Sequence, residues 1–115
     1  MEEKRRFPRL GIAVDVQWER APEAGNPDSN VTKDISAGGI CLIVYEEVSV
    51  GDLLNLRFTL PTGRTVQALG RVVWVAPFEF SSDRERPRRD AGIEFVHIEE
   101  EDRQEIAKFV FLATK

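Results

Sequence analysis

The sequence has little of the chemistry on which most enzymes depend. Its 115 residues contain one cysteine and one histidine, Cys41 and His97, which lie far apart in the chain. A metal cage of several His and Cys side chains is excluded within one chain, and a Cys–His catalytic pair is disfavoured. The chain also lacks a Gly-rich phosphate loop and a nucleophile elbow. We therefore expect a protein without catalytic residues, metal or cofactor, in which His97 has a structural or surface role.

Long apolar runs and a basic excess are also missing. No stretch approaches the roughly 20 apolar residues that span a bilayer, and the N-terminus is charged, so we expect neither membrane insertion nor a signal peptide. A formal net charge of -4 argues against a general binder of nucleic acid polymers, which needs a positive field. A single cysteine cannot form an internal disulfide, and a reducing cytoplasm is the simplest location.

Strand patterns occupy most of the chain. Apolar side chains recur at every second position, for example from Leu54 to Leu60, and this period predicts half-buried strands. The nearly continuous apolar run around Cys41 predicts a strand covered on both faces, with the thiol a small core residue. Polar segments at 19–30 and 77–90 predict loops. The strands are expected at residues 12–18, 31–35, 39–45, 53–60, 64–76 and 91–98.

One helix is predicted at the C-terminal end, over residues 99–114. Its first turn is acidic, which the helix dipole favours, and we expect those carboxylates to be solvated or to cap the helix. Four residues then have the spacing of a buried stripe: Ile106, Phe109, Val110 and Ala113. Several short strands followed by one helix predict a mainly β protein, a small antiparallel barrel with the helix packed on or across it. The length suits a single domain.

A short basic run stands before the first strand of this acidic protein, with Lys4, Arg5, Arg6 and Arg9 close together. Pro8 keeps the segment from being a helix interior. Two arginines four positions apart can then close on one ligand from two sides. Guanidinium groups bind phosphate, or the O6/N7 edge of guanine, with two parallel hydrogen bonds. The alternative is a solvated basic arm that pairs with neighbouring glutamates.

The stretch DISAGG, residues 34–39, is a second candidate site. Asp34 and Ser36 alternate at the end of a strand, so both side chains can point to one face. An ionised Asp34 can accept hydrogen bonds from the ring N–H and the exocyclic amine of guanine, and Ser36 can donate or accept. Gly38 and Gly39 allow positive φ or the close approach of a ligand. The alternative is a hairpin turn whose polar side chains satisfy local backbone groups.

Taken together, these motifs resemble the PilZ domain family over essentially the whole chain. The family's RxxxR pattern corresponds to residues 5–9, and its [D/N]xSxxG pattern to residues 34–39. Strands that include GRVVWV and AGIEF follow in the same order, and then the C-terminal helix. The resemblance implies a six-stranded antiparallel β-barrel of the split-barrel type with a helix from about residue 100. It further implies a flexible arginine-rich arm over residues 1–10 and a single barrel domain over 11–115.

The resemblance also implies a function, because many PilZ domains are receptors for the bacterial second messenger cyclic di-GMP. In the family, the arm folds over the nucleotide at the barrel surface. The arginines would grip guanine Hoogsteen edges and phosphates, the Asp and Ser would hold a guanine through N1 and N2, and the last glycine would keep the surface open. The implied ligand contacts are Arg5, Arg6, Arg9, Asp34, Ser36 and Gly39, with Arg6 more important if two nucleotides bind.

An alternative within the family is a PilZ-like protein-interaction module that binds no nucleotide. The basic residues at 84–89 could then form a contact patch, although a solvated loop offset by its own acidic residues is favoured. In either case we expect a downstream protein partner, and a monomer or a weak dimer. Trp74 could flank a ligand site, but its apolar alternation partners Val72 and Ala76 favour a core position.

Overall fold

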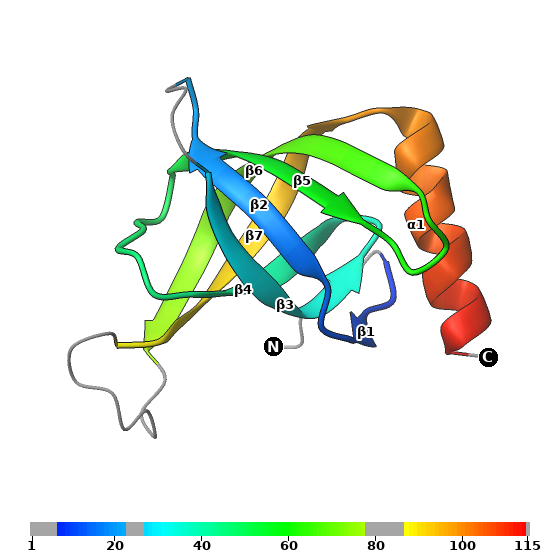
Figure 1. Ribbon diagram of the computed structural model, residues 1–115, viewed down its shortest axis with the longest axis horizontal. Coiled ribbons are helices and arrows are strands. Elements are labelled where there is room, and N and C mark those ends of the chain that lie inside the picture. Colours follow the sequence, from blue (N-terminus) through cyan, green and yellow to red (C-terminus); the bar gives the residue numbers. More distant parts are fainter. Residues whose placement is uncertain (1–6, 23–26, 78–86, 115) are drawn as a thin grey trace, which may run out of the picture.

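The computed structural model describes residues 7–22, 27–77 and 87–114. The strands and the helix of this part follow one another in the order β1 (Leu10–Gly11), β2 (Asp15–Arg20), β3 (Asp28–Ser36), β4 (Gly39–Val44), β5 (Leu53–Thr59), β6 (Thr65–Pro77), β7 (Arg89–Ile98) and α1 (Glu100–Ala113). All strand pairs are antiparallel, in the order β1-β3-β2-β5-β6-β7-β4, and a further β3–β4 pairing closes the sheet. The predicted six-stranded barrel with a C-terminal helix is therefore confirmed, and β1 is an additional short strand (Figure 1).

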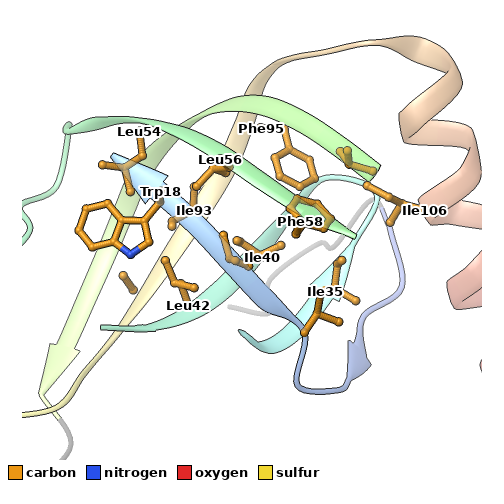
Figure 2. Close-up of a cluster of buried hydrophobic side chains, with 14 of the residues drawn as sticks. Trp18, Ile35, Ile40, Leu42, Leu54, Leu56, Phe58, Ile93, Phe95 and Ile106 are labelled. Atoms are coloured by element: carbon orange, nitrogen blue, oxygen red, sulfur yellow. The ribbon is translucent and has the colours of Figure 1, made fainter. Parts of the chain in front are cut away.

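Alternating side chains fill the inside of the barrel. Leu54, Leu56 and Phe58 of β5 are buried, and Asn55, Arg57 and Thr59, which alternate with them, are exposed, as the period of two predicts. Figure 2 shows the core extending from Trp18 on β2 to Ile106, which α1 contributes at the other end. The helix thus covers one open end of the barrel with its buried side chains.

The first predicted strand begins later than expected, and the short strand β1 precedes it. A single strand over residues 12–18 was expected, but β1 ends at Gly11 and β2 begins at Asp15. Thr32, which is buried, bridges the interruption, because its hydroxyl donates to the Ile12 carbonyl (2.7 Å) and accepts from the Val14 N–H (2.9 Å). A polar side chain from β3 therefore replaces ladder bonds that a continuous strand would have made.

The two predicted loops are shorter than expected, so those predictions were partly wrong. β2 continues to Arg20 and β3 begins at Asp28, although residues 28–30 are polar. Cross-strand contacts outweigh composition here, since the Trp18 indole N–H donates to the Asn30 side chain across the pair (2.9 Å). At the second loop, β6 extends to Pro77 and β7 begins at Arg89, while residues 78–86 lie outside the described part.

The helix matches the prediction in position but not in every contact. Ile106 and Val110 are buried and Phe109 is half-buried, whereas Ala113 is exposed, so the predicted buried stripe ends before it. Asp102 is buried rather than solvated, and its carboxylate accepts a hydrogen bond from Arg64 Nε at 2.9 Å. That hydrogen bond raises the pKa of Arg64. The α1 helix is too short and too polar to cross a bilayer, and it is the single helix among the described residues.

Candidate functional site

The DISAGG stretch lies at an outward-facing part of the barrel wall. One row of paired residues crosses four neighbouring strands: Asp34 on β3, Cys41 on β4, Gly92 on β7 and Trp74 on β6. Residues directly opposite one another in an antiparallel sheet point to the same face. The adjacent Ile35, Ile40 and Ile93 are buried in the core, so the row faces outward. We call this surface the β3–β4–β7–β6 face.

Arg9 and Asp34, one from each sequence motif, meet on this face. Arg9 Nη1 donates to Asp34 Oδ1 at 2.7 Å, and the two side chains are 28% and 26% exposed. The short strand β1 brings them together, because it pairs Leu10 with Ile35 and Gly11 with Asp34. The structure thus juxtaposes a fork of donors and a carboxylate acceptor at the surface. Arg5 and Arg6 lie outside the described residues.

Ser36 holds the turn between β3 and β4. It is only 3% exposed. Its hydroxyl oxygen accepts from the N–H groups of Gly38 (3.1 Å) and Gly39 (3.2 Å), and its O–H donates to the Gly39 carbonyl (3.2 Å). In this arrangement the hydroxyl satisfies local backbone groups, which is the turn interpretation of the motif.

The two glycines of the turn make room for protein atoms. Neither has positive φ; in the described chain that conformation occurs at Gly51 and Gly63. A Cβ on Gly39 would lie 2.1 Å from the Ile93 carbonyl oxygen of β7, and a Cβ on Gly38 would lie 2.8 Å from the Phe7 ring. Close strand pairing and the docking of Phe7 therefore account for glycine at these positions.

Helix α1 also reaches the turn, through a residue that the sequence analysis missed. Arg103 Nη1 donates to the Ala37 carbonyl at 3.0 Å, and its guanidinium lies 5.7 Å from the centroid of the Phe7 ring. A cation over an aromatic face is attracted to it. Arg103 thus connects the helix, the β3–β4 turn and the N-terminal segment, and no pattern in the sequence indicates this connection.

Trp74 lies on the surface, so the predicted core position was wrong. Its side chain is 43% exposed, whereas Val72 is buried. The register of β6 and β7 shifts between Val72 and Trp74, so the two residues no longer share a face. The indole lies against Gly92, where an added Cβ would be 2.0 Å from the indole nitrogen. The bulge therefore adds an exposed aromatic ring to the β3–β4–β7–β6 face.

A second charged group occupies the same face beyond Cys41. Asp90 Oδ2 lies 3.3 Å from Lys33 Nζ, and Asp90 Oδ1 lies 3.3 Å from Arg88 Nε. Asp90 was expected in a loop, but it belongs to β7 and pairs with Ile43 of β4, whereas Arg88 precedes the strand. Alternation along β7 from outward-facing Gly92 places Asp90 on the same face.

Cys41 lies between the two charged groups and is buried, as predicted, although it points to the outward face rather than into the barrel core. The pKa of its thiol is raised from 9.0 to about 11, chiefly by burial and then by the carboxylates of Asp34 and Asp90, while Lys33 and Arg9 oppose the rise. The thiol therefore stays protonated at neutral pH, which makes it a poor nucleophile.

Other parts of the described chain are weaker candidates for a functional site. His97 is exposed, which agrees with a surface role. The described residues contain no group of three or more His, Cys, Asp or Glu side chains that could hold a metal ion. A hollow of about 740 Å³ lies on the opposite wall, where Gln17, Asn55 and Gln67 are among its lining residues. Asp34 does not line it, and we place the candidate site where the motifs meet rather than in this hollow.

Comparisons with known proteins identify the family and the fold. The profile described as PilZ domain matches residues 3–112. Among solved structures, that of the Bacillus subtilis inhibitor of motility (MotI/DgrA) is 21% identical with a TM-score of 0.78, covering 98% of this chain and 52% of that chain. The structure of the K. pneumonia MrkH–c-di-GMP complex is 22% identical with a TM-score of 0.76, and the match covers 98% of this chain and 52% of that chain.

The PilZ domain of Escherichia coli YcgR with c-di-GMP is 12% identical with a TM-score of 0.72, and the match covers 95% of this chain and 90% of that chain. This chain therefore spans about half the length of the first two proteins and nearly all of the third. Among curated proteins, no sequence matches this chain.

Proposed function

This chain belongs to the PilZ domain family, and from that premise we propose that it is a receptor for cyclic di-GMP. The observation that carries the proposal is the 2.7 Å ion pair of Arg9 with Asp34, which unites the two motifs on the β3–β4–β7–β6 face. Two structures that share the fold were solved with c-di-GMP, those of MrkH and YcgR. The ligand is a dianion with two guanines, so a site with basic donors and one carboxylate suits it.

The proposed contacts follow from the two edges of guanine. Asp34 accepts hydrogen bonds from N1–H and the N2 amine, and Arg9 donates to O6 and N7 or to a phosphate. Arg5 and Arg6 supply further donors from the N-terminal segment. Gly39 leaves the turn free of a side chain, and Ser36 keeps that turn in shape.

Trp74 is a candidate flank for the second base. It lies three strands from Asp34 in the outward row, about 14 Å at the usual spacing of strands. Its exposed indole offers a surface on which a base can stack, and such stacking is worth about 1–3 kcal/mol per base. A ligand with two guanines can use the carboxylate for one base and the indole for the other.

The proposed mechanism is a change of surface rather than a reaction. The arginine-rich arm closes over the nucleotide, and Phe7 and Arg9 are the described residues through which it contacts the barrel. Ordering a segment by ligand contacts is a common way to switch a protein. The altered surface would be recognised by a downstream protein partner in the cytoplasm.

Base selectivity tests the proposal. Asp34→Asn replaces an acceptor-only group with one that also donates. The variant should therefore bind cyclic di-GMP roughly tenfold or more weakly, while its affinity for cyclic di-AMP should change little. Equilibrium binding of both nucleotides to the wild type and to the variant measures this effect. Asp15→Asn, at an exposed position on β2, is the matched control. Equal affinity of the wild type for the two nucleotides, or no effect of Asp34→Asn, would contradict the proposal.

A further inference from the structure

One side of α1 carries a regular stripe of side chains that does not face the barrel. The helix turns Ile106 and Val110 into the core, and it forms one edge of the molecule (Figure 1). The stripe consists of four residues spaced four, three and four positions apart: Glu101, Glu105, Lys108 and Leu112. This is the spacing of the seam between two paired helices, and it places all four side chains on one side of α1. We call these residues the α1 stripe.

The C-terminal half of the α1 stripe is apolar and open. Leu112 is 57% exposed, and Phe109 beside it is half-buried. A hollow of about 420 Å³ lies along the stripe, between the helix and Thr62 of the β5–β6 turn, and Glu105 and Lys108 also line it. This half of the stripe therefore has room for side chains of another molecule.

The charged residues of the α1 stripe have no partners of their own. Within the described part of the chain, the side chains of Glu101, Glu105 and Lys108 make no hydrogen bond or ion pair. Glu105 and Lys108 are one helical turn apart, a spacing at which opposite charges often pair, but they do not pair with each other. The cation Arg64 is hydrogen-bonded to Asp102 instead. Two carboxylates and one ammonium group thus remain available at the surface.

The α1 stripe is complementary to itself in one orientation. Its midpoint lies between Glu105 and Lys108, so an antiparallel second copy places Glu105 of each chain opposite Lys108 of the other. The same register places Leu112 opposite Glu101, whose methylene groups can cover an apolar neighbour. A parallel copy would instead place like charges opposite each other. Charges along the seam of paired helices commonly decide their orientation in this way.

We propose that the α1 stripe is the interface of an antiparallel dimer of this chain, with the two-fold axis between Glu105 and Lys108. Both copies use the same surface, so the assembly closes at two chains. Exposed ion pairs contribute little, typically about 0–1 kcal/mol each, so the dimer is weak and dissociates on dilution. The inference does not depend on cyclic di-GMP, whose proposed site lies on the β3–β4–β7–β6 face.

The test is sedimentation equilibrium of the full chain over a series of concentrations, without nucleotide. The average mass of the wild type should rise with concentration from that of a monomer toward that of a dimer. Lys108→Glu and Glu105→Lys should each raise the dissociation constant roughly tenfold, because each replaces two attractions by two repulsions. Arg71→Glu on β6 and Glu46→Lys after β4 make the same charge changes at exposed positions elsewhere, and both should associate as the wild type does.

A mixture of the two α1 variants makes the test decisive. When Lys108→Glu and Glu105→Lys are combined in equal amounts, each mixed pair again has opposite charges at both positions. Association should therefore return to at least the strength of the wild type, which misfolding of either variant would not allow. A wild type that stays monomeric at the highest concentration would overturn the proposal. A dimer that neither variant weakens, or a mixture without recovery, would overturn it as well.

Discussion

The pairing of β4 with β7 at the candidate site requires a residue without a side chain at position 39. The position that a Cβ would occupy lies 2.1 Å from the Ile93 carbonyl oxygen, which belongs to backbone that cannot rotate away. Gly39→Ala should therefore push β4 from β7 and lower the free energy of unfolding by about 1–3 kcal/mol. Urea denaturation measures the loss.

Gly11→Ala is the control for that substitution, since its Cβ would lie at an ordinary 3.9 Å from the Lys33 carbonyl oxygen. A glycine that needs no special conformation gains stability from alanine through the unfolded chain, by about 0.4–1 kcal/mol. Equal stability of the Gly39 and Gly11 variants would show that the two strands separate easily, and it would contradict the close pairing.

Single residues also show what the sequence could not reveal. Asp34 and Arg9 stay predicted site residues, and the resemblance of their two motifs to the PilZ patterns was what singled them out. Trp74 was misplaced because one bulge reverses which face a residue occupies, and a bulge leaves no mark in the alternation of apolar residues. Asp90 was assigned to a loop because its neighbours are polar, although β4 extends the sheet to it.

Among the structural elements, α1 has the clearest connection to the site. Arg103 donates to the Ala37 carbonyl and lies over Phe7, and Glu100 is 3.7 Å from it one turn earlier. Arg103→Ala should cost about 1 kcal/mol of stability and speed amide exchange in the turn at residues 36–39. Gln104→Ala, one position along and exposed, should do neither. Unchanged exchange in the turn would contradict the connection.

The type of each strand and helix was predicted better than the residues at which it begins and ends. The β5–β6 hairpin was recognisable because apolar residues alternate on both sides of Pro61-Thr62-Gly63, and Gly63 indeed has positive φ. The start of β3 was missed because residues 28–30 are polar and become a strand only by pairing with β2. Such pairing depends on contacts between distant segments, which composition within one segment does not reveal.

For the whole molecule, the distribution of charge over the surface matters more for binding an anionic ligand than the net charge does. The chain is acidic overall, yet three of its described cations, Arg9, Lys33 and Arg88, lie on the β3–β4–β7–β6 face. Each is held by Asp34 or Asp90. The order of motifs was enough to predict the barrel, because each motif occupies a fixed place in the family's strand order. Predicting the face required the strand register, which only the folded chain provides.

The central claim is that the two motifs bind cyclic di-GMP, and calorimetric titration of the wild type and Arg9→Ala tests it most directly. Saturable binding that GTP does not reproduce is expected, and the loss of one bidentate, charge-assisted contact should weaken it roughly tenfold to a hundredfold. Arg57→Ala, on the opposite wall, should bind as the wild type does. No binding by the wild type at high nucleotide concentration, or equal binding by Arg9→Ala, would contradict the account.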